Sequence, residues 1–590
     1  MKLYYLASLF MGSLVAAQND YGPINTDWVG ATDDQALALP FGTPWGAKTA
    51  NNTNMLVDPP TTGMIRRYDF TISRGTISPD GYQKDALLVN GIFPGPMIEA
   101  NWGDTIQVTM HNRITGPEEG TGLHWHGILQ KDSQWMDGVP GVSQCPIPPG
   151  GDFTYSFQAD LYGSSWYHSH YSAQYAGGIL GPMIIHGPKT LPYDIDIGPV
   201  LLTDHYHPDY FSLVEKVMGT DTTQVIVSSD NNLINGRNPF DCSTVTAGDT
   251  TTCVDTTDVS AFKFTPGAVH LLRLINAGAE GFQKFSLDGH NMTVIANDFV
   301  PILPYSTQVV TLGIGQRTDV LIYSSSAASG SYAMRSTMAF SATNQASALA
   351  VVYYSTIPAV PVVPDTEPWP AFTDAASQTS NDDLSLTEPW YPIPAVATPA
   401  TVETIDITVG VNATGHTLWT MNGSSFRANY NQPILLLSNV GNNSYPDSPQ
   451  WNVYNFGSNS SIRIILNNFI GAAHPIHLHG HNMQVLSEGV GTWDGTVVRS
   501  TNPQRRDVQI LRGNGYMVLQ IDADNPGAWP LHCHIAWHVS AGLYVTVLER
   551  PDDIEQLSIP SSMAQTCRDW GTYTGDNVVD QIDSGLRRRE

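Results

Sequence analysis

Apolar and polar residues alternate in short runs along nearly the whole chain, and turn-forming residues separate one run from the next. The runs are rich in Val, Ile, Thr and Tyr, and the separators in Gly, Pro, Asn and Asp. Successive side chains of a strand point to opposite faces, so a period of two is typical of half-buried strands. Long amphipathic helical patterns are scarce. The pattern therefore predicts an all-β protein made of β-sandwich domains.

Two sequence patterns occur more than once. Residues 476–485 (IHLHGHNMQV) are matched by residues 285–294 (FSLDGHNMTV), and residues 123–127 (LHWHG) are a shorter third copy. Residues 166–170 (WYHSH) likewise match residues 529–534 (WPLHCH). Repetition on this scale indicates three related units.

The repeats and the composition together predict the domain organisation. The expected segments are a signal peptide at 1–17, an N-terminal extension at 18–60, sandwich domains at 61–188, 189–357 and 401–566, a Pro-rich linker at 358–400 and a C-terminal tail at 567–590.

The N-terminus and the charge favour an exported protein. Met1-Lys2 precedes an apolar run that ends in Val15-Ala16-Ala17, which is typical of a secretory signal peptide with a small-residue cleavage site. The run is shorter than the roughly 18–20 residues that a membrane span needs. The 54 acidic and 27 basic residues give a formal charge of −27, which argues against nucleic acid or an anionic membrane as a partner. We expect a soluble, extracellular protein.

Glycosylation sequons fit that location. We expect glycans at five Asn-x-Ser/Thr sites, namely Asn51, Asn412, Asn422, Asn442 and Asn459. A sixth sequon, at Asn291, lies in an apolar, strand-like stretch and is a poorer candidate.

Candidate chemistry is concentrated in residues 532–538, His-Cys-His-Ile-Ala-Trp-His. On a strand His532 and His534 share one face and Cys533 points to the other, so one strand can serve two metal sites. A thiolate with two histidines is the ligand set of a blue copper electron-transfer centre.

Three further groups supply histidines, and each contains a His-x-His pair that a strand directs to one side. They are His124-Trp125-His126, His168-Ser169-His170 and His474-Pro475-Ile476-His477-Leu478-His479. A single pair is weak support for a metal site, but four pairs, one of them bracketing a cysteine, are strong. A zinc protein is the alternative, but closed sets of four ligands do not explain eleven candidates with one thiolate.

These four motifs resemble those of the multicopper oxidases, and the chain from about Tyr68 onward is similar to the ascomycete laccases. The resemblance implies three cupredoxin-like Greek-key domains and four copper ions per chain. It assigns the type 1 copper to His474, Cys533 and His538, and the type 2 copper to His124 and His477. It assigns the type 3 pair to His126, His168, His170, His479, His532 and His534.

The resemblance also implies roles for residues outside these ligand sets. Asp204 matches the carboxylate that accepts the proton of a phenol, although an Asp after a strand can equally cap a turn. Asp137 matches a carboxylate near the type 2 copper, and Leu543 stands where an axial methionine can be. Some relatives carry a second acid within the heptad where this chain has Ala536, which leaves the second proton donor unnamed.

Five cysteines leave an odd one, which a role for Cys533 as a copper ligand explains. Cys242 and Cys253 are close enough in sequence for a local loop, and the resemblance implies that Cys145 and Cys567 tie the first domain to the tail. The tail resembles laccase ends that are cut after a leucine, here Leu586. The other histidines, which include His205 and His207, show no partner pattern, and we expect structural or surface roles for them.

The function implied is that of a laccase, with small phenolic or aromatic donors and O2 as substrates and a monomer as the expected state. Two other classes stay open. A ferroxidase would need acidic residues around the type 1 site, and a non-enzymatic electron-transfer protein would need only the type 1 ligands.

Overall fold

The computed structural model describes residues 42–339, 342–354, 360–365, 380–445 and 451–575. The expected signal peptide at 1–17 and the expected cleavage after Leu586 lie outside this part of the chain and stay predictions. Among the described residues, no helix is long and apolar enough to span a membrane. The described strands form six sheets, in three pairs that follow one another along the chain.

The first pair of sheets is built from residues 65–186. Its sheets have the orders β2-β1-β4-β6 and β3-β8-β7-β5. The strands are β1 (Ile65–Ile77), β2 (Lys84–Val89), β3 (Ile98–Asn101), β4 (Thr105–Asn112), β5 (Leu123–Trp125), β6 (Asp152–Gln158), β7 (Gly163–Ser169) and β8 (Leu180–His186). In β4 every second residue is buried, as the period of two predicts.

The second pair of sheets is built from residues 195–354. Its orders are β10-β9-β12-β17-β14-β15 and β11-β19-β18-β13-β16. The strands are β9 (Ile195–His205), β10 (Asn231–Ile234), β11 (Ser260–Phe264), β12 (Val269–Asn276), β13 (Phe282–Leu287), β14 (Met292–Asn297), β15 (Val300–Thr307), β16 (Val310–Leu312), β17 (Arg317–Tyr323), β18 (Ser331–Ala339) and β19 (Ser347–Tyr354). Helix α1 (Tyr210–Val217) follows β9, and the Asp209 carboxylate caps it by accepting from the Phe211 N–H.

The third pair of sheets is built from residues 401–549. Its orders are β21-β20-β23-β28-β25-β26 and β22-β30-β29-β24-β27. The strands are β20 (Thr401–Val411), β21 (Thr417–Met421), β22 (Val453–Asn455), β23 (Ser461–Asn468), β24 (His474–Leu478), β25 (Met483–Val490), β26 (Gln504–Arg506), β27 (Val508–Leu511), β28 (Gly515–Asp522), β29 (Gly527–Cys533) and β30 (Tyr544–Glu549). Short helices complete it, namely α2 (Ile434–Asn439), α3 (Ala536–Ser540), α4 (Pro551–Ile554) and α5 (Ser561–Thr574).

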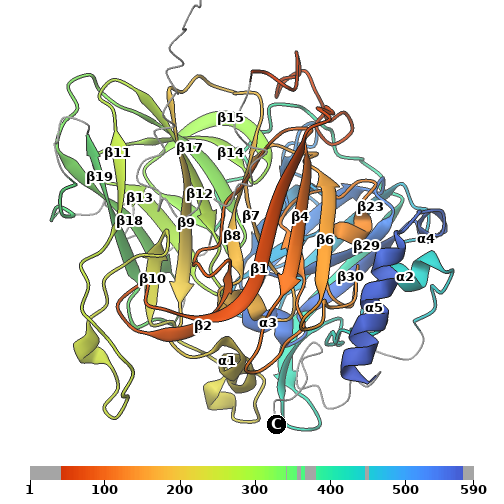
Figure 1. The fold of residues 1–590 in the computed structure, drawn as a ribbon. Coiled ribbons are helices and arrows are strands. Elements are labelled where there is room, and N and C mark those ends of the chain that lie inside the picture. Colours follow the sequence, from red (N-terminus) through yellow and green to blue (C-terminus); the bar gives the residue numbers. More distant parts are fainter. Residues whose placement is uncertain (1–41, 340–341, 355–359, 366–379, 446–450, 576–590) are drawn as a thin grey trace, which may run out of the picture.

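These three pairs of sheets confirm the predicted all-β fold (Figure 1). One continuous apolar core runs through the first and third units, and the second unit has a large core of its own. Strands β24 and β29 are buried along their whole length, so they lack the alternation of half-exposed strands. Both strands carry histidine motifs.

Two disulfides tie the loops and the tail. Cys145 pairs with Cys567 of α5, across 422 residues, and Cys242 pairs with Cys253 within one loop. Cys533 is the one unpaired cysteine of the described residues, and it is buried. The long-range bond holds α5 against the first unit, where Trp570 lies 6.3 Å from the ring of Tyr171. Closing so long a loop restricts the unfolded chain strongly.

Candidate metal centres

Cys533, His474 and His538 meet at the end of β29. The Cys533 Sγ lies 3.6 Å from the Nδ1 atoms of both His474 and His538, and these two nitrogens are 3.2 Å apart. Ligands held at metal distances of about 2.0–2.3 Å stand roughly 3.3–3.8 Å from one another. The three atoms therefore fit around a single ion.

Main-chain hydrogen bonds hold these three residues together. The His534 N–H donates to the Pro475 carbonyl at 2.7 Å, which joins the start of β24 to the end of β29. Leu543 accepts from the Cys533 N–H at 3.1 Å and donates to the His538 carbonyl at 2.9 Å. The main chain of Leu543 thus lies beside Cys533 and His538, and its side chain is fully buried. His538 itself lies on helix α3, which the strand pattern of the heptad did not predict.

His538 is the outermost of the three. His474 and Cys533 are buried, and His538 is half-buried. The His538 ring stacks on Trp419 of β21, with ring centroids 4.3 Å apart. His538 is therefore the part of this centre nearest to the surface.

The remaining eight motif histidines gather in one buried cluster between the first and third units. His170, His479 and His532 form one triplet, in which the His532 Nε2 lies 3.4 and 3.1 Å from the Nε2 atoms of the other two. His126, His168 and His534 form a second triplet, with the His534 Nε2 3.3 Å from the His126 Nδ1. Each triplet can hold one ion.

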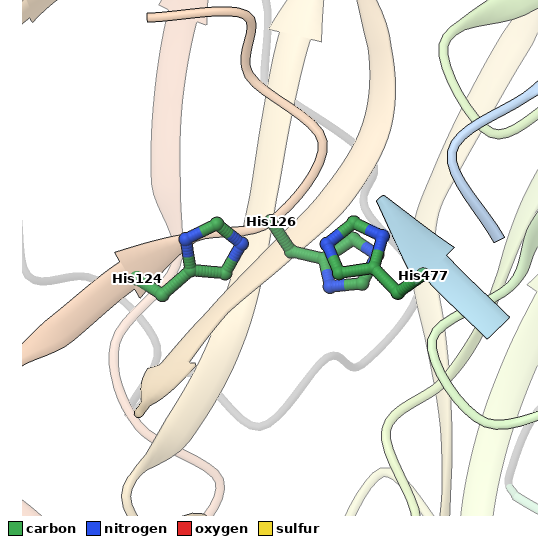
Figure 2. Close-up of side chains that lie close together, drawn as sticks. All are labelled: His124, His126 and His477. Carbon is green, nitrogen blue, oxygen red and sulfur yellow. The ribbon is translucent and has the colours of Figure 1, made fainter. Parts of the chain in front are cut away.

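His124 and His477 complete the cluster. They come from β5 and β24, and Figure 2 shows His477 beside His126 with the two rings overlapping. The centroids of His126 and His477 are 4.0 Å apart at an interplanar angle of 11°. The register explains the assembly, because His124 is paired with His168 in one sheet and His477 with His532 in another.

Outer contacts orient these rings. The Nδ1 atoms of four histidines lie 2.8–3.0 Å from main-chain carbonyl oxygens, namely His124 on Asp137, His168 on Ser169, His477 on Asp507 and His532 on Cys533. An N–H donated outward leaves Nε2 as the inner acceptor. The Nε2 atoms of His124, His168 and His477 are buried and have no hydrogen-bond partner among the described residues. Metal ions would satisfy these atoms, so the residues fit a metal cluster.

Burial also sets the protonation of the ligands. Desolvation, and then repulsion from the other imidazoles, lowers the pKa of His126, His170 and His479 well below the ordinary value. Desolvation lowers the pKa of His532 to about 3. These side chains are neutral near pH 7, which is the form that binds metals.

Two buried carboxylates contact the cluster from outside. The Asp137 Oδ2 lies 2.9 Å from the His479 Nδ1. Asp507, which sequence reasoning missed, has its Oδ1 3.1 Å from the His126 Nε2, and its carbonyl accepts from His477. Arg317 of the second unit donates to both Asp507 oxygens, at 2.5 and 2.7 Å. The unit without ligands thus helps to position ligands of the other two.

Glu280 lies beside Trp537, the residue before His538, and Asp204 is a neighbour of Glu280. The Asp204 carboxylate accepts from the N–H groups of three successive residues, Ala279, Glu280 and Gly281, at 2.6–2.7 Å, and Asp204 is 8% exposed. It therefore holds a turn, which is one of the two roles that the sequence left open. Glu280 interacts with Trp537 and Tyr206, and burial, followed by the charge of Asp204, raises the pKa of Glu280 to about 8. Sequence reasoning did not single out Glu280.

The expected glycosylation sites differ in their surroundings. Asn51, Asn412, Asn422 and Asn442 are exposed and Asn459 is half-buried. Asn291, the poorer candidate, is exposed too. The Asn422 Nδ2, to which a glycan would be joined, donates to the Thr404 carbonyl and to the Tyr454 hydroxyl.

Family comparisons agree with this geometry. Three models described as "Multicopper oxidase" match residues 71–190, 196–356 and 401–553. The chain is 36% identical to "Laccase-2" of Botryotinia fuckeliana over 557 residues, which cover 92% of each protein.

Solved structures of the same architecture include a laccase and an iron-related oxidase. The crystal structure of a laccase from Botrytis aclada matches 92% of this chain and 99% of its own, with a TM-score of 0.82 and 34% identity. Fet3p, described as a multicopper oxidase that functions in iron import, matches 86% of this chain and 95% of its own, with a TM-score of 0.74 and 25% identity.

Proposed function

Because the chain belongs to the multicopper oxidase family, we propose that it is a secreted laccase that oxidises phenols and related aromatic compounds and reduces O2 to water. Four bound copper ions would supply the chemistry, namely one-electron uptake from the donor and four-electron delivery to O2. Cys533, His474 and His538 would hold one of them, and the eight-histidine cluster the other three. The observation that carries this proposal is the direct chain linkage between the two ligand sets.

The linkage runs through residues 532–534. Cys533 lies in the thiolate set, and its two neighbours, His532 and His534, lie one in each histidine triplet. The His532 Nδ1 also lies 2.8 Å from the Cys533 carbonyl oxygen, close enough to donate to it. A single strand end therefore joins the outer centre to both triplets by covalent bonds and one hydrogen bond.

Residues around His538 suit an aromatic donor. The Trp419 indole covers one face of His538, and Trp537 and Tyr206 lie behind it with ring centroids 5.4 Å apart. These three rings are buried, so they form an apolar wall around His538, and the half-buried His538 is the part that a planar donor can contact. Asp204 would be a poor ligand for a hydrated ferrous ion, because it is buried and its oxygens accept main-chain N–H groups.

A phenol sheds a proton when it loses an electron, so a carboxylate near His538 has a role. We place that role on Glu280 ahead of Asp204, because the Asp204 oxygens already accept three N–H groups of the 279–281 turn. Burial and then the charge of Asp204 raise the pKa of Glu280 to about 8, so Glu280 accepts a proton readily in its ionised form, which becomes more populated as the pH rises toward 8.

Protons needed at the cluster would pass Asp137, which contacts His479 and His124 there. Asp507 is less suited to carry them, because Arg317 holds both of its oxygens. We assign Asp507 to positioning His126 and His477.

Oxygen uptake separates laccase from the two other classes. We expect steady O2 consumption with 2,6-dimethoxyphenol and a much slower rate with ferrous iron at equal concentration. A preference for ferrous iron would identify a ferroxidase. Reduction of the blue centre by the phenol without O2 consumption would identify an electron-transfer protein.

A further inference from the structure

A further His-x-His pair, His205-Tyr206-His207, begins at the last residue of strand β9 and lies outside the four motifs. Asp80, in the turn between β1 and β2, reaches this pair from the first unit. Its Oδ2 lies 3.0 Å from the His207 Nε2, and one ligand atom from each of Asp80, His205 and His207 lies within 4.8 Å of the other two. Ligands of a tetrahedral ion stand roughly 3.3 Å apart. Small side-chain shifts would therefore bring all three onto one ion.

One of these three ligand atoms is buried without a hydrogen-bond partner among the described residues. Asp80 is fully buried and His205 is 4% exposed. The His205 Nε2 is buried and has no hydrogen-bond partner within the described part of the chain. Leaving such an atom unpaired is costly, and a metal ion would satisfy it.

The surrounding charge favours a cation. Lys84 is buried nearby, where its ammonium donates to the Tyr206 carbonyl. Three carboxylates, those of Asp209, Asp230 and Asp80, act on that ammonium. The local charge is therefore negative before any ion binds, so a divalent cation would be attracted and not repelled.

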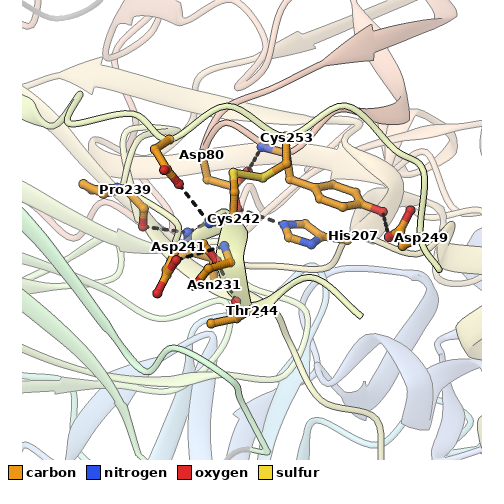
Figure 3. The surroundings of a disulfide bond; sticks show 12 residues. Asp80, His207, Asn231, Pro239, Asp241, Cys242, Thr244, Asp249 and Cys253 are labelled. Atoms are coloured by element: carbon orange, nitrogen blue, oxygen red, sulfur yellow. Dashed lines mark hydrogen bonds and ion pairs between the residues drawn. A yellow bond between two sulfur atoms is a disulfide. The ribbon is translucent and has the colours of Figure 1, made fainter. Parts of the chain in front are cut away.

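The group is also held rigidly. The Tyr82 ring stacks on His207 with centroids 3.8 Å apart, and Tyr82 forms a β-bridge with Cys253 of the loop disulfide. Figure 3 shows Asp80, His207 and Asn231 beside that disulfide, with Asn231 donating to the Asp80 Oδ2 at 3.2 Å. Gly81 has a φ of +99°, and a Cβ there would meet the Val254 carbonyl at 2.1 Å, so the loop packs directly on the turn. Ligands fixed in this way need little reordering on binding.

We propose that His205, His207 and Asp80 form a fifth metal site, for a first-row divalent ion such as Zn²⁺. Two imidazoles and one carboxylate are a ligand set that suits Zn²⁺, with water in the fourth position. A cavity of about 20 Å³ beside His205 and Lys84 has room for about one water. The ion would join the first unit to the second, so we expect it to raise thermal stability. This proposal does not rest on laccase chemistry.

Metal analysis of the full, copper-loaded protein tests the site. After equilibration with micromolar Zn²⁺ and removal of free metal, we expect one Zn²⁺ per chain in addition to copper, and a melting temperature that rises with Zn²⁺ concentration. His205→Gln, His207→Gln and Asp80→Asn should each lose the Zn²⁺ and the thermal shift while keeping the blue band. His111→Gln is the matched control, because His111 also lies between two carboxylates but at the surface, and it should keep both.

Cobalt gives a second measurement if a variant folds poorly. Co²⁺ added to the copper-loaded wild type should give the intense visible bands of a four-coordinate site, and excess Zn²⁺ should remove them. Wild type that takes up no Zn²⁺ beyond its copper would overturn the proposal. So would Zn²⁺ that persists in all three variants or is lost from the His111 control.

Discussion

The thiolate set and the histidine cluster differ in how far apart in the chain their parts come from. His474, Cys533 and His538 belong to one unit and are held by hydrogen bonds within 70 residues of each other. The cluster takes four histidines from the first unit and four from the third, and its outer support includes Arg317 of the second. The outer centre can therefore form within the third unit alone, whereas the cluster needs the assembled chain.

This difference suits the two tasks. One-electron exchange with a bulky donor needs a centre near the surface, and His538 supplies the exposed edge. Reduction of O2 needs enclosure, and all eight cluster histidines are buried. The ligand-free unit shows what the same strand becomes without metal. Where the third unit has His477 and His479, the second has Ser286 and Asp288, and Asp288 pairs with Arg335.

Removing the Cys533 thiolate should give the largest difference in effect between the outer centre and the histidine cluster. In Cys533→Ser the outer set loses its one soft ligand, so we expect the blue band to vanish and phenol turnover to fall by several orders of magnitude. Copper in the cluster should stay, because no cluster nitrogen is changed. Absorption spectra and copper analysis on the same sample measure both. A blue Cys533→Ser protein would show that the thiolate has been wrongly assigned.

Removing the Asp507 carboxylate, which contacts the histidine cluster from outside, should have the opposite effect: it should impair the cluster and spare the blue centre. Asp507→Asn weakens the side-chain contact that holds His126 and leaves Arg317 without its charged bidentate partner, whereas the main-chain carbonyl that accepts from His477 is unchanged. We expect cluster copper affinity or O2 turnover to fall roughly 10- to 100-fold while the blue band stays. Breaking this buried ion pair should also lower the free energy of unfolding by about 3–5 kcal/mol.

Glu488→Gln is the control for that experiment. Glu488 is a buried carboxylate of the same unit that bonds to Gln509 and Asn381 and to no cluster histidine. The Glu488→Gln substitution should therefore leave the copper content unchanged. If Asp507→Asn retains full cluster copper and turnover, outer contacts do not hold the cluster, and the contrast between the two regions fails.

These two experiments also mark how much the sequence could predict. The eleven candidate ligands stand in local patterns, because alternation on a strand is enough to put His532 and His534 on one side. Asp507 and Arg317 lie 190 residues apart, and no local pattern links them. Asp204 was read from its motif, but the turn that occupies its oxygens lies 75 residues further along the chain. His205 and His207 also form a His-x-His pair, but no local pattern links them to Asp80, which lies 127 residues from His207 in sequence.

Loss of the proton acceptor should slow only those donors that release a proton at the outer centre, and it should leave the histidine cluster unaffected. Glu280→Gln removes a base, so turnover of 2,6-dimethoxyphenol should fall roughly 100-fold while ferrocyanide, which has no proton to lose, is spared. Asp204→Asn should instead weaken the 279–281 turn and lower both rates together, along with thermal stability. The reverse pattern, with phenol-specific loss in Asp204→Asn alone, would return the acceptor role to Asp204.

The smallest expected effect concerns the strength of the outer centre as an oxidant. Leu543 is fully buried and bonded through its main chain to Cys533 and His538, and we propose that its side chain faces the axial position of the outer copper, where it would offer no donor atom. A thioether there would stabilise the cupric form over the cuprous form and lower the reduction potential. Each tenfold change in the stability of the cupric form relative to the cuprous form corresponds to about 59 mV for one electron. We expect Leu543→Met to lower the reduction potential by on the order of tens of millivolts. Leu543→Ile keeps the side chain apolar and controls for packing. Redox titration of the blue band measures all three proteins, and turnover of donors with high potentials should fall in parallel. An equal or higher potential in Leu543→Met would mean that residue 543 is not axial, and the outer centre would then differ from the cluster in location only.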